Sequence, residues 1–230
     1  MSQIATFQGE ALMYDFSLAI SPATPPSTAP YPARVGDDDA TAGPVMIYNA
    51  GAEIYAEGDR LGALYRLVYG VVRVYRLLAD GRRQICAFHR AGEIFGFEAG
   101  AERHFFADAV NPVGLRVLRP GSEVETSREL LNLALNSLEH AHDHLLTVGR
   151  NDAMGRVAAF LLEMGADRDG EALHEIDLPM SRADIGDYLG LTIETVSRVL
   201  TRLKSARVIR LASTRHLEIL RRDVLEDMTA

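Results

Sequence analysis

The sequence predicts an α+β protein in which an antiparallel β domain comes first, a long helix follows, and a compact helical domain with a β-hairpin comes last. Glycines recur at the spacing of β-turns in the first part, at Gly58, Gly70, Gly81 and Gly92. Apolar residues then change to a helical heptad spacing. Near the end of the chain, two capped helices are separated by a glycine turn. With 230 residues and 47% hydrophobic composition, each part can bury a core.

The composition excludes several classes of protein. The single cysteine, Cys86, cannot form an intramolecular disulfide or supply the ligands of a cysteine-held zinc or iron–sulfur site. The first twenty residues carry no basic segment typical of a signal peptide, and no apolar run approaches the roughly 20 residues that span a bilayer. We therefore expect a cytoplasmic protein without a membrane contact. The net charge of −8 argues at first against a nucleic-acid partner.

Residues 1–44 are predicted to form a mobile N-terminal extension. Six of the nine prolines lie between Pro22 and Pro44, and an acidic run occupies residues 37–39. Such a segment lacks the apolar residues that would offset the entropy of ordering it. The ordered protein is expected to begin near Val45.

Residues 45–122 are predicted to be the β domain. Strand-like runs occupy residues 64–68, 71–77 and 84–89, and the turn glycines lie between them. Asp80-Gly81 between the second and third run is a strong hairpin signal. The spacing of turns is typical of an antiparallel barrel or sandwich.

Residues 123–152 are predicted to be a dimerisation helix. Its apolar residues alternate at intervals of three and four, which is the pattern of two helices packing along a shared stripe. An alternative is an amphipathic helix packed on its own domain, for which Leu135 and Leu146 offer a further apolar face. The residues expected at the dimer interface are Leu131, Ala134, Leu138, Ala141, Leu145 and Val148.

Residues 153–230 are predicted to form a winged helix-turn-helix. A core helix at 156–164 and a short strand at 176–178 precede a helix at 181–189 that begins with the capping box Ser181-Arg182-Ala183-Asp184. After the turn at Gly190-Leu191, Thr192 caps a second helix that runs to about Ser205. Runs at 208–211 and 217–220 then form a hairpin wing. Helix, short glycine turn, helix and hairpin together define this motif.

The charge of the chain is divided unevenly. Residues 181–222 contain nine basic and four acidic side chains, which leaves 15 basic and 28 acidic side chains in the rest. The helix-turn-helix segment is therefore +5 and the remainder −13. A positive field on a winged helix-turn-helix is the electrostatic signature of DNA binding.

The second helix of the motif is predicted to read DNA bases with one face. Val196, Val199, Leu200 and Leu203 share the face that packs into the domain. The opposite face carries Glu194, Ser197 and Arg198. Arginine pairs with guanine O6 and N7, glutamate accepts from cytosine N4, and serine bonds to either base type. An alternative is that Glu194 and Arg198 form an ordinary surface ion pair.

Residues around this helix are predicted to hold the DNA backbone. Hydroxyl and cationic side chains near the two helix starts and on the wing supply donors for phosphate oxygens. These residues are Ser181, Arg182, Thr192, Thr195, Arg202, Lys204 and Arg215.

The stretch from Met180 to Arg198, with Glu194, Ser197 and Arg198 in an E-x-x-S-R arrangement, resembles the DNA-binding end of the CRP/FNR superfamily of bacterial regulators, in its FNR-like branch. The resemblance spans nearly all of residues 45–222. It implies an antiparallel β-roll, cupin-like and similar to a cyclic-nucleotide-binding domain, followed by a dimerisation helix and a winged helix-turn-helix. It further implies a homodimer that binds TTGAT-N4-ATCAA palindromes, with Ile193 contacting a thymine methyl group.

The resemblance is greatest to the FixK group, which lacks the cysteines of an iron–sulfur cluster. It implies a transcription activator that needs no small-molecule effector and recruits RNA polymerase at genes for microaerobic or anaerobic respiration and nitrogen fixation. Where carbon-monoxide sensors of this superfamily have haem ligands, this chain has Gly96 and Glu98. No nucleophile–base pair or phosphate-binding loop suggests an enzyme.

A cyclic-nucleotide-gated regulator is the alternative. Glu93 and Arg103 stand where that branch places its ribose-binding carboxylate and phosphate-binding arginine, but His104 replaces the expected serine. His140 and His144 share a helix face and are a weaker candidate for a metal, with His142 on another face. The expectation is that the protein holds no cofactor and no metal, and that Cys86 is a small buried apolar residue.

Overall fold

The computed structural model describes residues 43–118, 127–150, 152–166 and 174–229, and for residues 127–130 it describes only the backbone. All of these residues belong to one unit, Asp37–Ala230. The predicted mobile extension, residues 1–44, therefore lies almost entirely outside the described residues.

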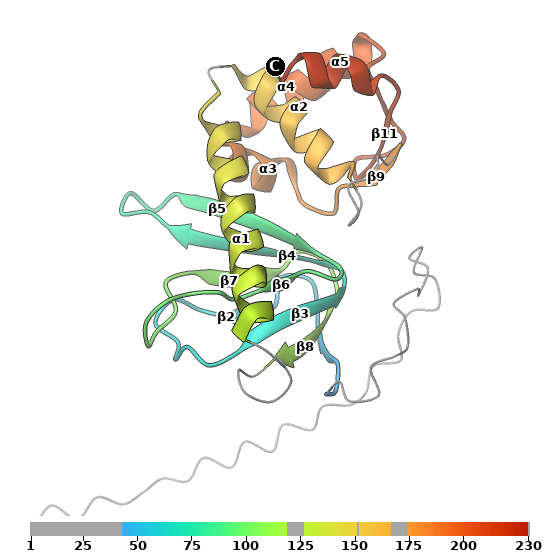
Figure 1. The fold of residues 1–230 in the computed structure, drawn as a ribbon. Helices are drawn as coiled ribbons and strands as arrows, with labels where there is room; N and C mark the ends of the chain where they lie inside the picture. The colour runs from blue at the N-terminus through green and yellow to red at the C-terminus, as the bar shows by residue number, and fades with distance from the viewer. Residues whose placement is uncertain (1–42, 119–126, 151, 167–173, 230) are drawn as a thin grey trace, which may run out of the picture. The chain divides into compact units, whose positions relative to one another are not determined.

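Two four-stranded antiparallel sheets form the N-terminal domain (Figure 1). The buried residues between the sheets form its core, which includes Leu67, Phe95 and Leu115. One sheet has the order β1-β8-β3-β6 and the other β2-β7-β4-β5. The strands are β1 (Met46–Tyr48), β2 (Glu53–Tyr55), β3 (Leu64–Tyr69), β4 (Val71–Leu77), β5 (Arg83–Arg90), β6 (Ile94–Phe95), β7 (Phe106–Ala109) and β8 (Val113–Leu118).

The turns of this domain are set by glycines at positive φ. Gly81 (φ 81°) lies in the predicted β4–β5 hairpin, where the Leu78 N–H donates to the Arg82 carbonyl at 2.8 Å. Gly70 (φ 90°) joins β3 to β4, and a Cβ there would lie 2.5 Å from the Pro112 carbonyl oxygen. Only glycine fits such a position. The hairpin prediction is confirmed, and β5 extends one residue beyond the predicted run at each end.

Two helices follow the β domain. The long helix predicted over residues 123–152 is present as α1 (Ser127–Val148), which ends four residues earlier than predicted; residues 123–126 lie outside the described residues. The predicted core helix is α2 (Ala153–Met164), which starts earlier than expected because Asp152 caps it by accepting a hydrogen bond from the Gly155 N–H at 2.8 Å. The described part of the chain contains no helix that is both long and apolar enough to cross a membrane.

The last segment is a winged helix-turn-helix, as predicted, with two additions. The predicted strand at 176–178 is β9, one residue earlier, and it pairs with β11 to give a three-stranded sheet of order β10-β11-β9. A final helix, α5, was not predicted because it is only six residues long and lacks a side-chain cap. The elements are β9 (Glu175–Asp177), α3 (Arg182–Leu189), α4 (Ile193–Ser205), β10 (Ile209–Leu211), β11 (His216–Ile219) and α5 (Arg222–Asp227).

The core of the winged helix-turn-helix continues into the β domain. Phe88 of β5 packs against Phe160 of α2 and Tyr188 of α3, with ring centroids 6.3 Å and 5.1 Å apart. Val71 and Ile85 belong to the same buried cluster. The two domains therefore share apolar contacts along β4 and β5.

Candidate nucleic-acid interface

The helix-turn-helix is held in shape by its caps and its turn. The Ser181 hydroxyl accepts a hydrogen bond from the Asp184 N–H at 3.0 Å, and the Asp184 carboxylate accepts one from the Ser181 N–H at 3.0 Å. This is the predicted capping box. Gly190 ends α3 in a left-handed conformation, and a Cβ on Gly186 would lie 2.6 Å from the Leu191 carbonyl oxygen. The close approach fixes the angle between α3 and α4.

The inner face of α4 is buried as predicted. Val196, Val199, Leu200 and Leu203 are each at most 7% exposed. Burial of an aliphatic side chain contributes about 1.5–3 kcal/mol each. The packing of this face determines which residues of α4 remain on the outside.

The outer face of α4 carries the residues predicted to read bases. Ile193 is 47% exposed, and Glu194, Ser197 and Arg198 are exposed too. Arg198 donates to the Thr195 hydroxyl at 3.3 Å, and within the described residues no ion pair joins it to Glu194. The structure therefore does not contain the Glu194–Arg198 ion pair that was considered as the alternative. The Arg198 guanidinium has hydrogen-bond donors left for a ligand.

Glu194 is in a form suited to accept hydrogen bonds. A hydrogen bond from its own backbone N–H and one from Thr192 hold the pKa of the Glu194 carboxyl below its usual value. An ionised carboxylate accepts only, which matches the N4 amino group of cytosine. Next to it, a shallow hollow along α4 is lined by Ser197, Arg198, Thr201 and Arg202.

Hydroxyls among the predicted backbone contacts already have partners within the motif. The Ser181 hydroxyl also donates to the Asp184 carboxylate at 2.7 Å, and Thr192 caps α4 by accepting from the Thr195 N–H at 3.3 Å. Arg182 donates to the Thr214 carbonyl of the wing at 3.2 Å. These residues brace the motif, so a phosphate contact would have to be added to these bonds or replace them.

Besides Arg182, which is half-buried, the cations of residues 181–222 fall into two groups. Arg210, Arg221 and Arg222 each form an ion pair with a carboxylate of the same domain. The others are exposed, and none has a carboxylate partner within the described residues. This second group comprises Arg198, Arg202, Lys204, Arg207 and Arg215. The positive charge available to an anion is thus concentrated on α4, the turn after it and the wing.

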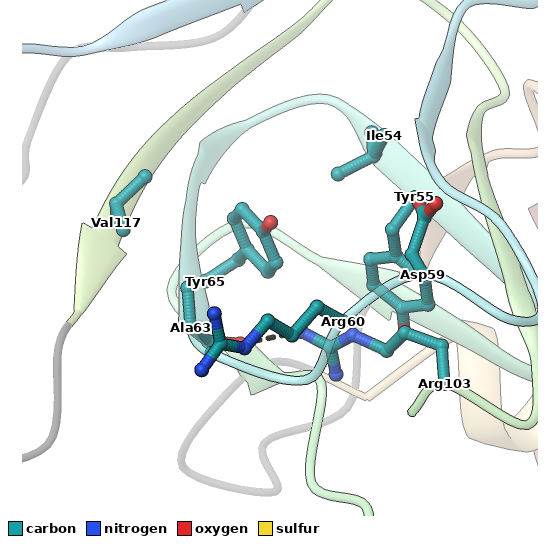
Figure 2. A pocket seen from close by; sticks show the side chains of 9 residues that line it. Ile54, Tyr55, Asp59, Arg60, Ala63, Tyr65, Arg103 and Val117 are labelled. Atoms are coloured by element: carbon teal, nitrogen blue, oxygen red, sulfur yellow. Dashed lines mark hydrogen bonds between the residues drawn. The ribbon is translucent and has the colours of Figure 1, made fainter. Parts of the chain in front are cut away.

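Arg103, the predicted phosphate-binding position of the β domain, is occupied by contacts within the protein (Figure 2). It is 3% exposed, and its guanidinium donates to the carbonyls of Ala63 at 2.6 Å and Gly96 at 2.7 Å. It also lies 3.4 Å from the Glu98 carboxylate and 4.2 Å from the centre of the Tyr55 ring. Arg103 therefore has few donors left for a phosphate.

Aromatic rings pack beside this arginine. Tyr55 stacks on Tyr65 at 5.9 Å, Tyr65 on Phe95 at 5.4 Å, and Phe95 on His89 at 5.2 Å between ring centroids. His89 in turn lies 3.1 Å from the carboxylate of Glu93, the predicted ribose-binding position. Both positions of the nucleotide alternative are thus engaged by neighbours. The remaining cavity, about 490 Å³, opens beside Arg60 and Arg103 and is not lined by Glu93.

The predicted dimer interface lies on the open side of α1. Leu131, Leu138 and Leu145 are 57%, 50% and 67% exposed. Ala141 is exposed, and Ala134 and Val148 are half-buried. Leu135 and Leu146 are also about half or more exposed, so they do not provide the intramolecular face considered as the alternative.

The histidines of α1 and the cysteine lie in different surroundings. His144 stacks on Tyr188 with centroids 4.0 Å apart, whereas His140 is exposed. No group of three potential metal ligands occurs in the described part of the chain. Cys86 is half-buried rather than fully buried, and burial raises the pKa of its thiol, which keeps it protonated at neutral pH.

One cluster of charges was not predicted. Arg73 of β4 and Arg83 of β5 form ion pairs with Asp184 and Asp187 of α3. These partners lie more than 100 residues apart in the chain. Nothing local in the sequence marks such a pairing, because charged residues on a strand and on a helix are ordinarily solvated.

Comparisons with known proteins agree with this architecture. Residues 45–122 match the cyclic nucleotide-binding domain and residues 155–228 match the Crp-like helix-turn-helix domain. The chain is 48% identical over 184 residues to the nitrogen fixation regulation protein FixK of Rhizobium meliloti (strain 1021), which covers 80% of this chain and 86% of that protein. It is 41% identical over 204 residues to FixK of Azorhizobium caulinodans, covering 84% and 82%.

A solved structure is similar over most of its length. The structure of FixK2 from Bradyrhizobium japonicum superposes with a TM-score of 0.75 at 41% sequence identity, covering 81% of this chain and 97% of that one. The fold, the helix-turn-helix and these similarities define a DNA-binding transcription regulator rather than an enzyme. More particularly, the chain belongs to the CRP/FNR family and is a transcription activator of the FixK type.

Proposed function

We propose that the protein binds TTGAT-N4-ATCAA palindromes as a homodimer and does so without a small-molecule effector. The observation that carries the proposal is the outer face of α4, where Ile193, Glu194, Ser197 and Arg198 are exposed and Arg198 has no carboxylate partner within the described residues. Arg198 and Glu194 would read bases, and Ser197 and Ile193 would refine the choice.

Backbone contacts would come from the exposed cations beside this face. Arg202 and Lys204 lie on α4 and Arg215 on the wing, all exposed. Arg182, Thr192, Thr195 and Ser181 would add further contacts to phosphate oxygens, and such backbone contacts fix the register of a recognition helix in the major groove.

The leucines of α1 support dimer formation. Regulators of the CRP family are dimeric, and a palindrome requires a two-fold axis in the protein. Three exposed leucines at heptad spacing, Leu131, Leu138 and Leu145, would be buried by a second copy of the helix. Ala134, Ala141 and Val148 would complete this interface.

The packing of the β-roll supports effector-free binding. The Arg103 guanidinium is used by two carbonyls and Glu98, and the neighbouring space holds the stacked rings. In the cell, we propose a cytoplasmic protein that recruits RNA polymerase at genes for microaerobic or anaerobic respiration and nitrogen fixation. The amount of protein would then be the regulatory signal.

A gel shift tests the proposal. Purified protein, in air and without added ligand, is titrated onto a TTGAT-N4-ATCAA duplex and onto a scrambled duplex of the same composition. We expect a retarded complex at concentrations at least about 1,000-fold lower on the palindrome, the usual lower limit for specific over non-specific binding. Equal retardation of both duplexes would contradict the proposed site.

A cyclic-nucleotide-gated regulator is the second candidate. It is favoured by the match of residues 45–122 to the cyclic nucleotide-binding domain and by the cavity beside Arg60 and Arg103. Calorimetry with cyclic AMP and cyclic GMP separates the two. Binding heat together with a gain in DNA affinity would overturn the effector-free proposal, whereas no heat with either nucleotide supports it.

A further inference from the structure

Five charged side chains link the β domain to the first helix of the helix-turn-helix, and we call them the interdomain ion cluster. Arg73 and Arg83 are its cations, and Asp108, Asp184 and Asp187 are its anions. Arg73 bonds Asp108 at 2.9 Å and Asp184 at 3.0 Å. Arg83 bonds Asp184 at 2.5 Å and Asp187 at 2.7 Å.

The cluster is largely shielded from water. The side chains of Asp184 and Asp108 are 6% and 10% exposed, those of Arg73 and Arg83 are 18% and 24% exposed, and that of Asp187 is 34% exposed. Both guanidinium groups also lie near the Tyr75 ring, 5.9 Å and 5.6 Å from its centre. Ion pairs in such surroundings are screened much less than pairs on the surface, and removing one partner leaves a charge uncompensated.

The cluster acts on the start of α3. One carboxylate oxygen of Asp184 closes the capping box with Ser181, and the other accepts from both arginines. Burial opposes the ionisation of Asp184, but the hydrogen bonds from Ser181 and the charges of Arg73 and Arg83 outweigh it and hold the pKa of its carboxyl below the usual value. Asp184 is therefore the anion in both contacts at neutral pH.

The tight turn between α3 and α4 ties the orientation of α4 to that of α3. Because Gly186 and Leu191 are in close contact and Thr192 caps α4, the turn sets the orientation of α4 relative to α3. A second contact holds the other part of α3, since the Gln84 side chain donates to the Asp187 carbonyl at 2.8 Å. The direction in which α4 presents Arg198 is thus tied to β4 and β5.

We propose that Arg73 and Arg83 are positioning residues for DNA binding, which fix the helix-turn-helix relative to the β domain so that the two recognition helices of a dimer match their half-sites. This role rests on the proposed palindrome binding. The interdomain ion cluster would then orient the helix-turn-helix relative to the β domain without a bound ligand.

Spacing of the half-sites provides the test. Adding or removing one base pair rotates one half-site by about 35° relative to the other, so a rigidly held pair of helices discriminates strongly between spacers. Fluorescence anisotropy is measured on palindromes with three, four and five base pairs between the half-sites, and on a duplex with one half-site. The proteins are the wild type, Arg83→Ala, Arg83→Lys and Arg82→Ala, and circular dichroism confirms that each is folded at the assay temperature.

Arg82→Ala is the matched control, because Arg82 is exposed and pairs with Asp80 of its own hairpin. For Arg83→Ala we expect about tenfold weaker binding to the four-base spacer, a smaller preference among spacers, and unchanged affinity for the single half-site. Arg83→Lys keeps one charge and should recover part of the preference. Arg82→Ala should behave as the wild type.

Asp187→Asn gives an independent variant if Arg83→Ala fails to fold, because it leaves the capping box of Asp184 intact. The double variant Arg83→Ala/Asp187→Asn should bind no more weakly than Arg83→Ala alone, since Arg83→Ala already removes the ion pair with Asp187. Unchanged affinity and spacer preference in these variants would overturn the positioning role, and so would tighter binding. If the wild type shows no preference for the palindrome, it is the proposed function that fails.

Discussion

Arginines in two regions of this protein have opposite surroundings. In the β domain, Arg103 is buried and bonded to carbonyls, a carboxylate and a ring. On α4, Arg198 is exposed and its only hydrogen bond within the described residues is to the neighbouring Thr195 hydroxyl. The same side chain therefore serves as a structural cross-link in one place and as a free donor in the other. The difference indicates where the molecule has binding capacity left for an anion.

The strongest test of this comparison is to remove the buried arginine, Arg103. Arg103→Ala should lower the free energy of unfolding by about 3–5 kcal/mol, because it leaves Glu98, whose side chain is 5% exposed, without its cation. Urea unfolding followed by circular dichroism measures the effect. The control is Arg60→Ala, an exposed arginine that lines the same cavity, for which we expect a change within about 0.5 kcal/mol.

If Arg103 were instead a ligand-binding residue, its removal would abolish nucleotide binding and alter stability little. That pattern, together with binding heat for the wild type, would contradict the structural role. The structural role and the ligand-binding role of Arg103 thus predict different free energies of unfolding for Arg103→Ala and different heats of nucleotide binding.

The sequence predicted the DNA-binding region better than it predicted the β domain. The capping box at Ser181, the cap at Thr192 and the burial of Val196 and Leu200 depend on residues within one or two helical turns, and the structure contains all of them. Local rules suffice because the motif is built from neighbours in the chain. The exposure of Arg198 followed from the same periodicity.

The interactions of Arg103, Arg73 and Arg83 could not be predicted in this way. The hydrogen-bond and ion-pair partners of Arg103 lie in loops up to 40 residues away, and those of Arg73 and Arg83 lie on β7 and α3, up to 111 residues away. Resemblance placed Arg103 at a phosphate position, but the structure shows that it contacts carbonyls of the protein. The position of a residue in a motif does not state whether its donors are free.

Removal of the exposed arginine, Arg198, tests the other half of the comparison. Arg198→Ala should weaken binding to the palindrome by about 1–3 kcal/mol and relax selectivity at one base pair, because one bidentate base contact is lost. Its stability should stay within about 0.5 kcal/mol of the wild type, since the side chain is exposed. Anisotropy titrations on the palindrome and on duplexes substituted at each position measure both effects. An equal loss on every duplex, scrambled ones included, would show that Arg198 contacts the backbone instead.

His144 is an exception to the rule that interior polar groups are satisfied. Its Nδ1 is buried and has no hydrogen-bond partner in the described residues, and burial lowers the pKa of its imidazole. The unfolded chain therefore binds a proton more readily, so the stability that neutral His144 allows is present above pH 6.5 and declines as the pH falls toward the folded-state pKa. We expect His144→Phe to lie within about 1 kcal/mol of the wild type at pH 7.5, because it removes an unpaired polar atom but keeps a ring against Tyr188.

Unfolding in urea at pH values from about 7.5 to 5.5 tests this expectation through the linkage between proton binding and stability. The wild type should lose stability relative to His144→Phe as the pH falls, whereas His142→Gln, at an exposed position of the same helix, should follow the wild type. Contributions of other histidines cancel in the difference between variants. Parallel curves for the wild type and His144→Phe would mean that His144 is not a buried neutral group.

The smallest expected effect concerns a cation that should touch only phosphate. Lys204 is exposed near the end of α4, and its ammonium is a point charge without the planar fork of an arginine. Lys204→Ala should weaken binding by less than about tenfold, by the same factor on palindromic and scrambled duplexes, and should reduce the slope of log K against log salt by about one. Anisotropy at several salt concentrations measures the slope, with Arg221→Ala as the control because Arg221 is already paired with Asp223. An unchanged slope would remove Lys204 from the interface, and a loss confined to the palindrome would make it a base-reading residue. Either result would show that an exposed cation of α4 without a carboxylate partner is not necessarily a contact to the DNA backbone.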